Sequence, residues 1–158
     1  MPSYGFSVGR DVSLTVVLST GTLTFTGLTD FTADPMTTDL KSKGIDGTPR
    51  FGFIPDGWKG SFKMDRLDPS VDTWWAALEA AYFTGTNSAV GTISEIITEA
   101  TGAVTQFQYS GVVLRLEKAG DWGGDKKVEQ SVSFEAAKKT LISSSTATTT
   151  ATTTTPTT

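Results

Sequence analysis

The chain has 158 residues, enough for one compact domain, and its 13 basic and 17 acidic side chains give a formal charge of −4. It contains no cysteine and no histidine, which excludes disulfides, thiolate metal sites and the Ser–His and Cys–His nucleophile systems. An acidic chain is also a poor candidate for a protein that binds nucleic acid through clustered Lys and Arg.

The N-terminal part of the chain predicts β-strands. In residues 11–19 every second side chain is apolar, which is the period of a half-buried strand. Thr20-Gly21 predicts a turn, and the β-favouring residues from 22 to 31 predict a second strand. Asp34-Pro35 is predicted to end it, because Pro restricts its predecessor and lacks a hydrogen-bond donor.

Residues 37–57 lack the strand pattern. The segment mixes charge, Gly and Pro, and Asp46-Gly47 and Asp56-Gly57 are typical turn dipeptides. A long connection of this kind is usually functional or disordered, so we take it as the first candidate for an interaction surface, with an ordinary hairpin loop as an equally weighted alternative. Its charges of both signs fit docking on a complementary copy of the chain, and they equally fit a solvated loop.

A strand and a helix follow. The apolar side chains of residues 58–64 alternate with polar ones and predict a strand. Asp68 is a capping residue, Pro69 fits the first helical position, and Thr84-Gly85 predicts the end of the helix. An apolar stripe at spacings of three and four comprises Val71, Trp74, Trp75, Leu78 and Tyr82. We expect this stripe to pack on the sheet, with a partner-binding face as the alternative.

A β-hairpin is predicted at residues 92–117, with its turn at residues 100–103. In its second strand the apolar residues change phase, from Phe107 and Tyr109 to Val112 and those that follow, which predicts a bulge at Gly111. A last strand with clear alternation lies at residues 128–136.

Residues 143–158 are almost entirely Ser and Thr, with no charge and no large apolar residue, so nothing offsets the entropy of ordering them. We therefore expect a β domain at residues 1–142 and a Ser/Thr-rich, low-complexity tail at 143–158. The N-terminus lacks the regions of a secretion signal and no stretch is long and apolar enough for a membrane helix, so we expect a soluble protein.

No organised catalytic or metal-binding motif is present in the sequence. The acidic residues at 121–125 lack the spaced ligands and the terminal Glu of a calcium loop. A pair of carboxylates could act without histidine, but exposed strand faces account for the candidate pairs, Glu95/Glu99 and Glu129/Glu135. We predict that the chain is not an enzyme and has no catalytic residue, cofactor or metal. The fold class predicted is mainly β, a β-sandwich or barrel with one flanking α-helix.

The order of these elements resembles that of the major tail tube proteins of contractile-tailed (myovirus-type) bacteriophages, whose fold group includes type VI secretion tube proteins. The resemblance covers most of the folded part and is one of pattern and order, because no short motif in it is diagnostic. It is carried by the segments TTDLKSKGIDGTPRFGFIPDGWKGSFKMDR, WWAALEAAYFTG, GTISEIITEATGAVTQFQYSGVVLRLEKAGDW and KKVEQSVSFEAAKK.

This resemblance implies a structural subunit of the inner tail tube. Copies of the chain would form hexameric rings around a continuous β-barrel, and the stacked rings would conduct DNA during ejection without binding it specifically. An acidic lumen would let DNA slide through the tube, because its negative charge repels the DNA backbone. The implied partners are further copies of the chain, the tail sheath, the baseplate, tail-terminator proteins and a tape-measure protein, with no membrane. The implied location is the virion tail, after synthesis in the bacterial cytoplasm.

In this family the long loop after the second strand reaches neighbouring subunits. The resemblance therefore assigns an inter-subunit role to loop residues Asp39, Lys41, Lys43, Asp46, Arg50 and Phe53.

Two alternatives remain open. The tube of a related contractile injection system would share the fold and differ in its cargo. A carbohydrate-binding β-sandwich module would instead stack sugar rings on Trp58 or Trp122 and use the Ser/Thr tail as a linker. The missing secretion signal and the core-like spacing of the aromatic residues count against that second alternative.

Overall fold

The predicted mainly β architecture with one helix is confirmed by a computed structural model, which describes residues 12–25, 27–87 and 90–145. The described part contains β1 (Val12–Leu18), β2 (Gly21–Leu23), β3 (Leu28–Lys43), β4 (Pro49–Asp65), α1 (Ser70–Phe83), β5 (Gly91–Thr98), β6 (Val104–Lys118), β7 (Glu129–Ala136) and β8 (Lys138–Ser145).

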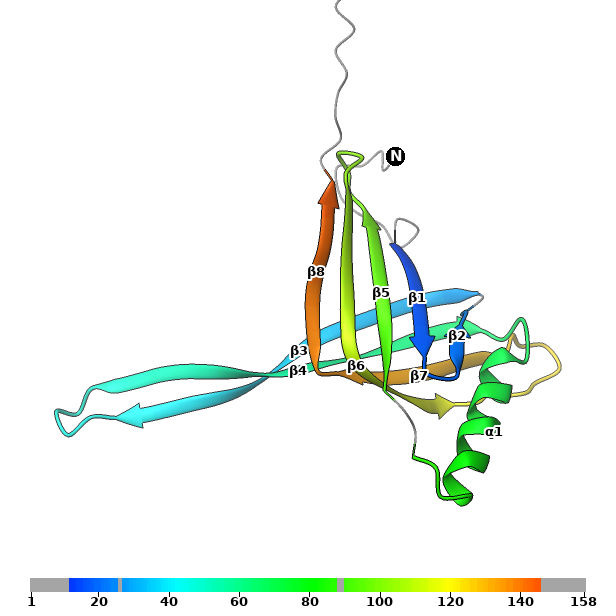
Figure 1. Cartoon of the computed structure of the whole chain (residues 1–158), viewed down its shortest axis with the longest axis horizontal. Coiled ribbons are helices and arrows are strands. Elements are labelled where there is room, and N and C mark those ends of the chain that lie inside the picture. Colours follow the sequence, from blue (N-terminus) through cyan, green and yellow to red (C-terminus); the bar gives the residue numbers. More distant parts are fainter. Residues whose placement is uncertain (1–11, 26, 88–89, 146–158) are drawn as a thin grey trace, which may run out of the picture.

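The strands form two layers that share β6. One layer, here called the upright sheet, has the order β2-β1-β5-β6-β8. The other, here called the crossing sheet, has the order β6-β7-β4-β3, and every pairing in both is antiparallel. Figure 1 shows β1, β5 and β8 standing across the direction of β3, β4 and β7. The arrangement is that of an orthogonal sandwich whose corner is made by a strand that changes sheets.

That corner lies at Gly111, where the predicted bulge is confirmed, because the pairing of β6 with β5 passes from Val112 to Ser110. Residues 104–110 of β6 pair with β8, whereas residues 113–118 pair with β7. Gly111 has φ +66°, and a Cβ there would come within 3.0 Å of the Cβ of Ala137. The N–H of Ala137, between β7 and β8, donates to the carbonyl of Ser110 at 3.0 Å. The two neighbouring strands therefore turn the corner together.

The core lies between the two sheets and is built from the alternating positions that the sequence predicted in β1, β5, β6 and β7. Its centre is aromatic, with rings of Phe31, Phe62 and Phe134 separated by 5.2–5.8 Å. The buried apolar side chains are Val16, Leu23, Phe62, Met64, Val71, Ile93, Tyr109, Val112, Leu114, Val132, Phe134 and Ala136.

The predicted strand end at Asp34-Pro35 and the predicted loop at residues 37–57 are both wrong. β3 continues through Pro35, which pairs with Trp58, and reaches Lys43. Proline is tolerated there because β3 is an edge strand. Of the two predicted turn dipeptides, Asp46-Gly47 forms the turn between β3 and β4, whereas Asp56-Gly57 lies within β4 at a bulge. The segment lacked a strand pattern because neither of its faces is buried.

β8 was not predicted, because its last three residues are the first residues of the Ser/Thr-rich segment. It pairs with β6 from Lys138 to Ser145, so residues 143–145 belong to the sheet. Residues 146–158 of the expected tail lie outside the described residues.

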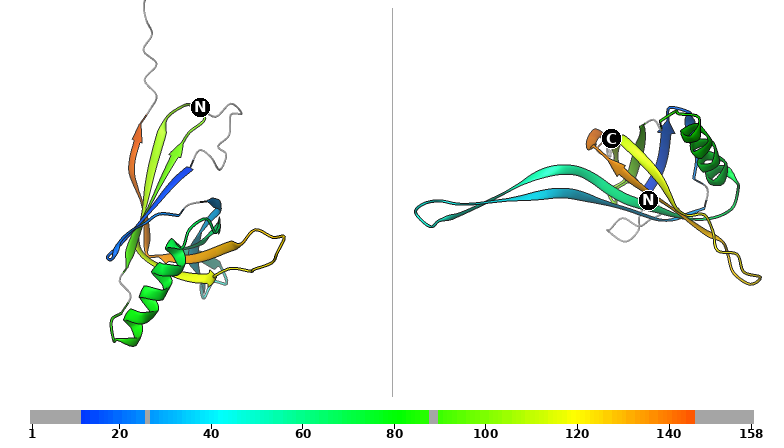
Figure 2. Two further views of the ribbon diagram at one scale, coloured as in Figure 1. Left: turned by 90° about the vertical axis from the view of Figure 1, so that its right-hand side faces the viewer. Right: turned by 90° about the horizontal axis from the view of Figure 1, so that it is seen from below.

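The helix is anchored to the sheets at its first turn. Val71 is buried, and Asp72 accepts hydrogen bonds from Arg66 Nε and from Nε2 of the buried Gln130, both at 2.8 Å. Pro69 is the N-cap rather than the first helical residue, and Asp68 accepts the N–H of Ser70 at 2.9 Å. The rest of α1 extends away from the sheets (Figure 2), so the expected packing of the apolar stripe holds for its beginning only. No helix in the described ranges is long and apolar enough to cross a membrane.

Close packing of the crossing sheet gives a first testable prediction, at Gly60. A Cβ at this position would lie 2.6 Å from the Phe134 ring and would also clash with the carbonyl of Thr32. Gly60→Ala is therefore expected to lower the free energy of unfolding by roughly 3 kcal/mol, measured by urea denaturation. Gly52→Ala is the matched control, because its Cβ would have an ordinary 3.9 Å contact with Leu40. Equal stability of the two variants would contradict the prediction.

Candidate assembly surface

The most exposed part of the molecule is the distal half of the β3–β4 hairpin, residues 37–57, here called the arm. In the body, residues 58–65 of β4 pair with β7 as well as with β3. Beyond them β3 and β4 pair with each other alone and project from the body as a two-stranded ribbon (Figure 1). A two-stranded ribbon has no core of its own and is marginally stable by itself.

Strand register divides the arm side chains between two faces, because paired residues of antiparallel strands point to the same side. Asp39 pairs with Phe53, Lys41 with Phe51, and Lys43 with Pro49. One face, here called the Phe face, therefore carries Asp39, Lys41, Lys43, Phe51 and Phe53. The opposite face carries Leu40, Arg50 and Ile54.

Both faces of the arm expose large apolar side chains. Phe51 and Phe53 are 74% and 67% exposed, and Leu40 and Ile54 on the opposite face are about half exposed. Monomeric proteins rarely expose such groups together unless they form part of an interaction site. Both faces of the arm are therefore candidate interaction surfaces.

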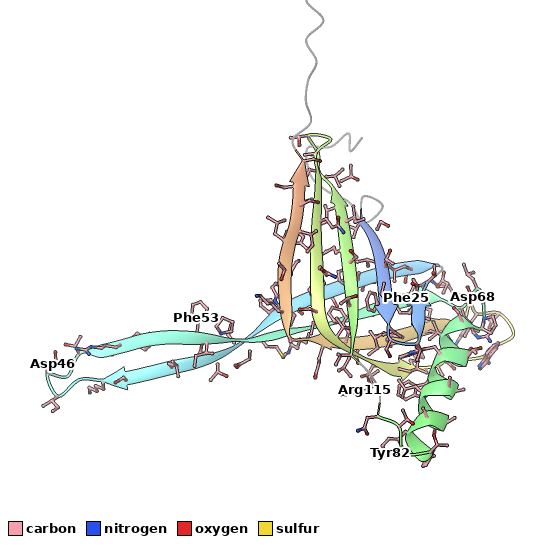
Figure 3. The ribbon with its side chains drawn as sticks, viewed as in Figure 1. Phe25, Asp46, Phe53, Asp68, Tyr82 and Arg115 are labelled. Carbon is pink, nitrogen blue, oxygen red and sulfur yellow. The ribbon has the colours of Figure 1, made fainter. Side chains whose placement is uncertain are left out.

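The predicted inter-subunit residues all lie on the arm, but not on one face. Asp39, Lys41, Lys43 and Phe53 share the Phe face, Arg50 lies on the opposite face, and Asp46 lies in the tip turn, where it accepts the N–H of Thr48 at 3.0 Å. Figure 3 shows Phe53 standing off the ribbon and Asp46 at its tip. Sequence reasoning missed the other exposed apolar residues of the arm, namely Leu40, Ile45, Phe51 and Ile54. What could have revealed them is that a segment without the alternation of a half-buried strand still contains several large apolar residues.

The arm cations have no carboxylate partner among the described residues. Within the described ranges Lys41, Lys43 and Arg50 form no ion pair, and Lys41 Nζ lies 5.7 Å from the centre of the Phe51 ring. Each of the three can therefore pair with an anionic group on a partner.

A second exposed apolar surface lies at the end of α1. Tyr82 and Phe83 are 67% and 78% exposed, and their ring centres are 5.6 Å apart. Glu79 precedes them by three and four positions, which makes all three neighbours on the helix surface. We call Glu79, Tyr82 and Phe83 the helix patch. In Figure 3 Tyr82 lies below the body, at the end of α1 and well away from the arm.

The outer faces of the two sheets are polar but differ in charge. On the crossing sheet, Asp34 pairs with Lys59 and Lys59 with Glu135, and Lys63 forms an ion pair with Asp30 at 3.6 Å. On the upright sheet the corresponding face is mostly uncharged. Two of its cross-strand rows are Ser13–Ile96–Gln106–Ser143 and Thr15–Ser94–Gln108–Thr140.

A buried ion pair lies beside the corner, on the inner face of the upright sheet. Lys139 Nζ is 3.0 Å from Glu95 Oε2, which also accepts a hydrogen bond from the Tyr109 hydroxyl at 3.1 Å. The ammonium lies over the rings of Trp58, Phe107 and Tyr109, at 4.3–5.1 Å from their centres. The expectation that Glu95 sits on an exposed strand face is wrong, because Glu95 is in phase with the buried Ile93.

This buried pair gives a prediction for alkaline pH. Burial raises the pKa of the Tyr109 hydroxyl above its ordinary value of 10, and the Glu95 carboxylate adds to the rise. The protonated Tyr109 hydroxyl contributes its full stability below pH 10. This contribution falls as pH rises further, because the unfolded chain releases the hydroxyl proton at a lower pH than the folded chain. Tyr109→Phe removes the titrating hydroxyl, so the free energy of unfolding of the variant should fall less steeply than that of the wild type between pH 10 and pH 11, by up to about 1.4 kcal/mol per pH unit. Identical slopes for the two proteins in urea denaturation would contradict the assignment.

Comparison with known proteins identifies the fold. No protein-family model and no curated protein matches the sequence. Among solved structures, a chain of the PVC extracellular contractile injection system sheath–tube complex, in the extended state, aligns with TM-score 0.58 and 10% identity, covering 89% of this chain and 93% of that one. Chains of the anti-feeding prophage tube-terminating cap and of the PVC sheath/tube terminator both align with TM-score 0.56 over 90% of this chain. Their identities are 13% and 9%, and 90% and 96% of their own lengths are covered. The chain therefore has the fold of tube and terminator proteins of contractile injection systems.

Proposed function

We propose that this chain is a structural subunit of a contractile tail or a related contractile injection system, and that it assembles into hexameric rings that stack as a tube. The observation that carries the proposal is the fold, which matches components of such particles over about nine tenths of the chain. The proposal gives the chain no catalytic role.

The unsatisfied surfaces of a single copy support self-assembly. The arm exposes apolar side chains on both faces, and the outer edges of β3 and β8 have no strand partner among the described residues. Open strand edges invite pairing with another chain, and closed rings remove them. A tube also needs a hydrated, polar inner wall. The outer face of the crossing sheet or that of the upright sheet would supply one.

In such a particle the tube would lie inside a sheath, between a baseplate and a terminator, with a tape-measure protein in its lumen. In a phage tail the lumen would conduct DNA from the virion, and in an injection system it would carry another cargo. The six predicted arm residues, Asp39, Lys41, Lys43, Asp46, Arg50 and Phe53, would contact neighbouring subunits.

A tube-terminating ring is a second candidate. Two of the matched structures are a tube-terminating cap and a sheath/tube terminator. A carbohydrate-binding role fits less well. Trp58 packs edge-on against buried Tyr109, with 5.9 Å between ring centres, and the guanidinium of Arg66 lies 5.2 Å from the exposed Trp122 ring.

Negative-stain electron microscopy of the purified protein, with sedimentation velocity over a concentration series, tests the proposal. Stacked rings or tubes are the expected result for a tube subunit, and single rings that do not stack would indicate a terminator. A protein that stays monomeric at all concentrations would overturn the proposal, and binding to immobilised glycans would then favour the carbohydrate-binding role.

A further inference from the structure

We propose that the Phe face of the arm docks on the helix patch of a neighbouring copy of this chain. The inference rests on the proposed self-assembly and deepens it by naming the two surfaces that meet.

Each of the two surfaces exposes a pair of aromatic rings, and their net charges are opposite, because the Phe face carries two lysines and one aspartate whereas the helix patch carries one glutamate. The Phe face presents two exposed aromatic rings beside the ammonium groups of Lys41 and Lys43, which have no carboxylate partner in the described ranges. The helix patch presents two exposed rings beside Glu79, which forms no ion pair with any described residue. Aromatic rings and opposite charges brought together in this way give both affinity and register.

The helix end adds a second source of negative potential. The last carbonyl groups of α1 carry the negative end of the helix dipole, and the last turn contains no basic residue. Lys41 and Lys43 would supply the cations that this end lacks.

Other exposed aromatic surfaces fit the arm less well. Among the described residues, the strongly exposed aromatic side chains outside the arm are Tyr82, Phe83 and Trp122. The guanidinium of Arg66 lies over the Trp122 ring and would repel the arm cations. The outer face of the crossing sheet carries ion pairs and hydrogen bonds of its own, including Ser133 to Glu117 at 2.6 Å.

The positions of the two surfaces require that the contact joins different copies. The arm projects sideways away from the body, whereas Tyr82 lies at the end of α1 below the body (Figure 3), so the arm of one copy cannot reach its own helix patch. A contact between two different surfaces is heterologous, and it repeats from copy to copy until a ring closes or a filament grows. This is the type of contact that a ring-forming subunit needs.

Engineered cysteines test the contact directly, because the chain contains no native cysteine. In the double variant Phe53→Cys/Phe83→Cys, oxidation of assembled protein is expected to give a ladder of covalent oligomers that ends at the ring size on a non-reducing gel. The matched control Phe53→Cys/Ser133→Cys, with its second cysteine on the outer face of the crossing sheet, should stay monomeric on the gel. Crosslinking of the control pair and not of the test pair would overturn the inference.

Charge reversal is the second test, and it leaves the aromatic rings in place. Lys41→Glu/Lys43→Glu is expected to raise the protein concentration needed for assembly by roughly tenfold or more, equivalent to about 1.4 kcal/mol. Adding Glu79→Lys to that variant should restore assembly, whereas adding Glu135→Lys should not. Rings that form equally well in all these variants would overturn the docking, and wild-type protein that forms no ring would overturn the proposed function itself.

Discussion

Replacing Lys139 by methionine is expected to lower the free energy of unfolding by about 3–5 kcal/mol, because it leaves the Glu95 carboxylate buried without its cation. Methionine keeps most of the length of the lysine side chain, so the lost contacts with the surrounding rings are few. The native pair is well enclosed, with 19% of the Lys139 side chain and 9% of the Glu95 side chain exposed. Urea denaturation monitored by tryptophan fluorescence measures the change.

The double variant Lys139→Met/Glu95→Gln separates the loss of charge pairing from the loss of packing. Glutamine removes the unpaired charge and keeps an acceptor for the Tyr109 hydroxyl, so we expect most of the lost stability to return. If Lys139→Met alone unfolds within about 0.5 kcal/mol of the wild type, the pair does not stabilise the fold and the expectation is wrong.

The place of this ion pair explains why its loss should be costly. Lys139 follows the corner residue Ala137 by two positions, and Trp58, over which its ammonium lies, pairs with Ala136 in the crossing sheet. Glu95 and Tyr109 belong to β5 and β6 of the upright sheet. Lys139, Glu95, Tyr109 and Trp58 therefore connect the two sheets where the chain passes from one to the other. These contacts help to fix the relative orientation of the sheets.

The sequence predicted the elements that have one buried face. In β1, the β5–β6 hairpin and β7, alternation follows directly from burial, and the change of phase at Gly111 marks the corner. The burial of Glu95 was not predicted, because its carboxylate is stabilised by Lys139, far along the chain. The periodicity of a single sequence does not show such a pairing.

The arm and β8 could not be recognised from periodicity, for two different reasons. Both faces of the arm are exposed in one copy, so its strands show no alternation between apolar and polar residues. β8 runs into a Ser/Thr segment that looks like a disordered tail, and its order comes from backbone hydrogen bonds to β6. The sequence pointed to this segment through its charges, whereas most of its exposed apolar residues became evident as part of a candidate interaction surface only from the structure.

Deletion of the arm is expected to abolish assembly and to leave the fold intact. Thr38 and Ile54 are a cross-strand pair, so an Asn-Gly turn can join them in place of residues 39–53. The deleted part has no contact with the core, because its side chains are exposed. The shortened protein should therefore unfold within a few degrees of the wild type. Sedimentation velocity and electron microscopy should find it monomeric at concentrations at which the intact protein is expected to form rings.

Mixing the two proteins sharpens this prediction, because the shortened chain keeps its helix patch but offers no arm. It can accept the arm of an intact neighbour and then ends the series of contacts, so adding it to the intact protein should reduce closed rings in proportion to its share. The matched control is the full-length chain with the single substitution Glu79→Lys. This variant keeps its arm and loses the charge complementarity of its helix patch. Rings that contain the shortened chain as readily as the intact one would show that the arm is not the contact that closes the ring.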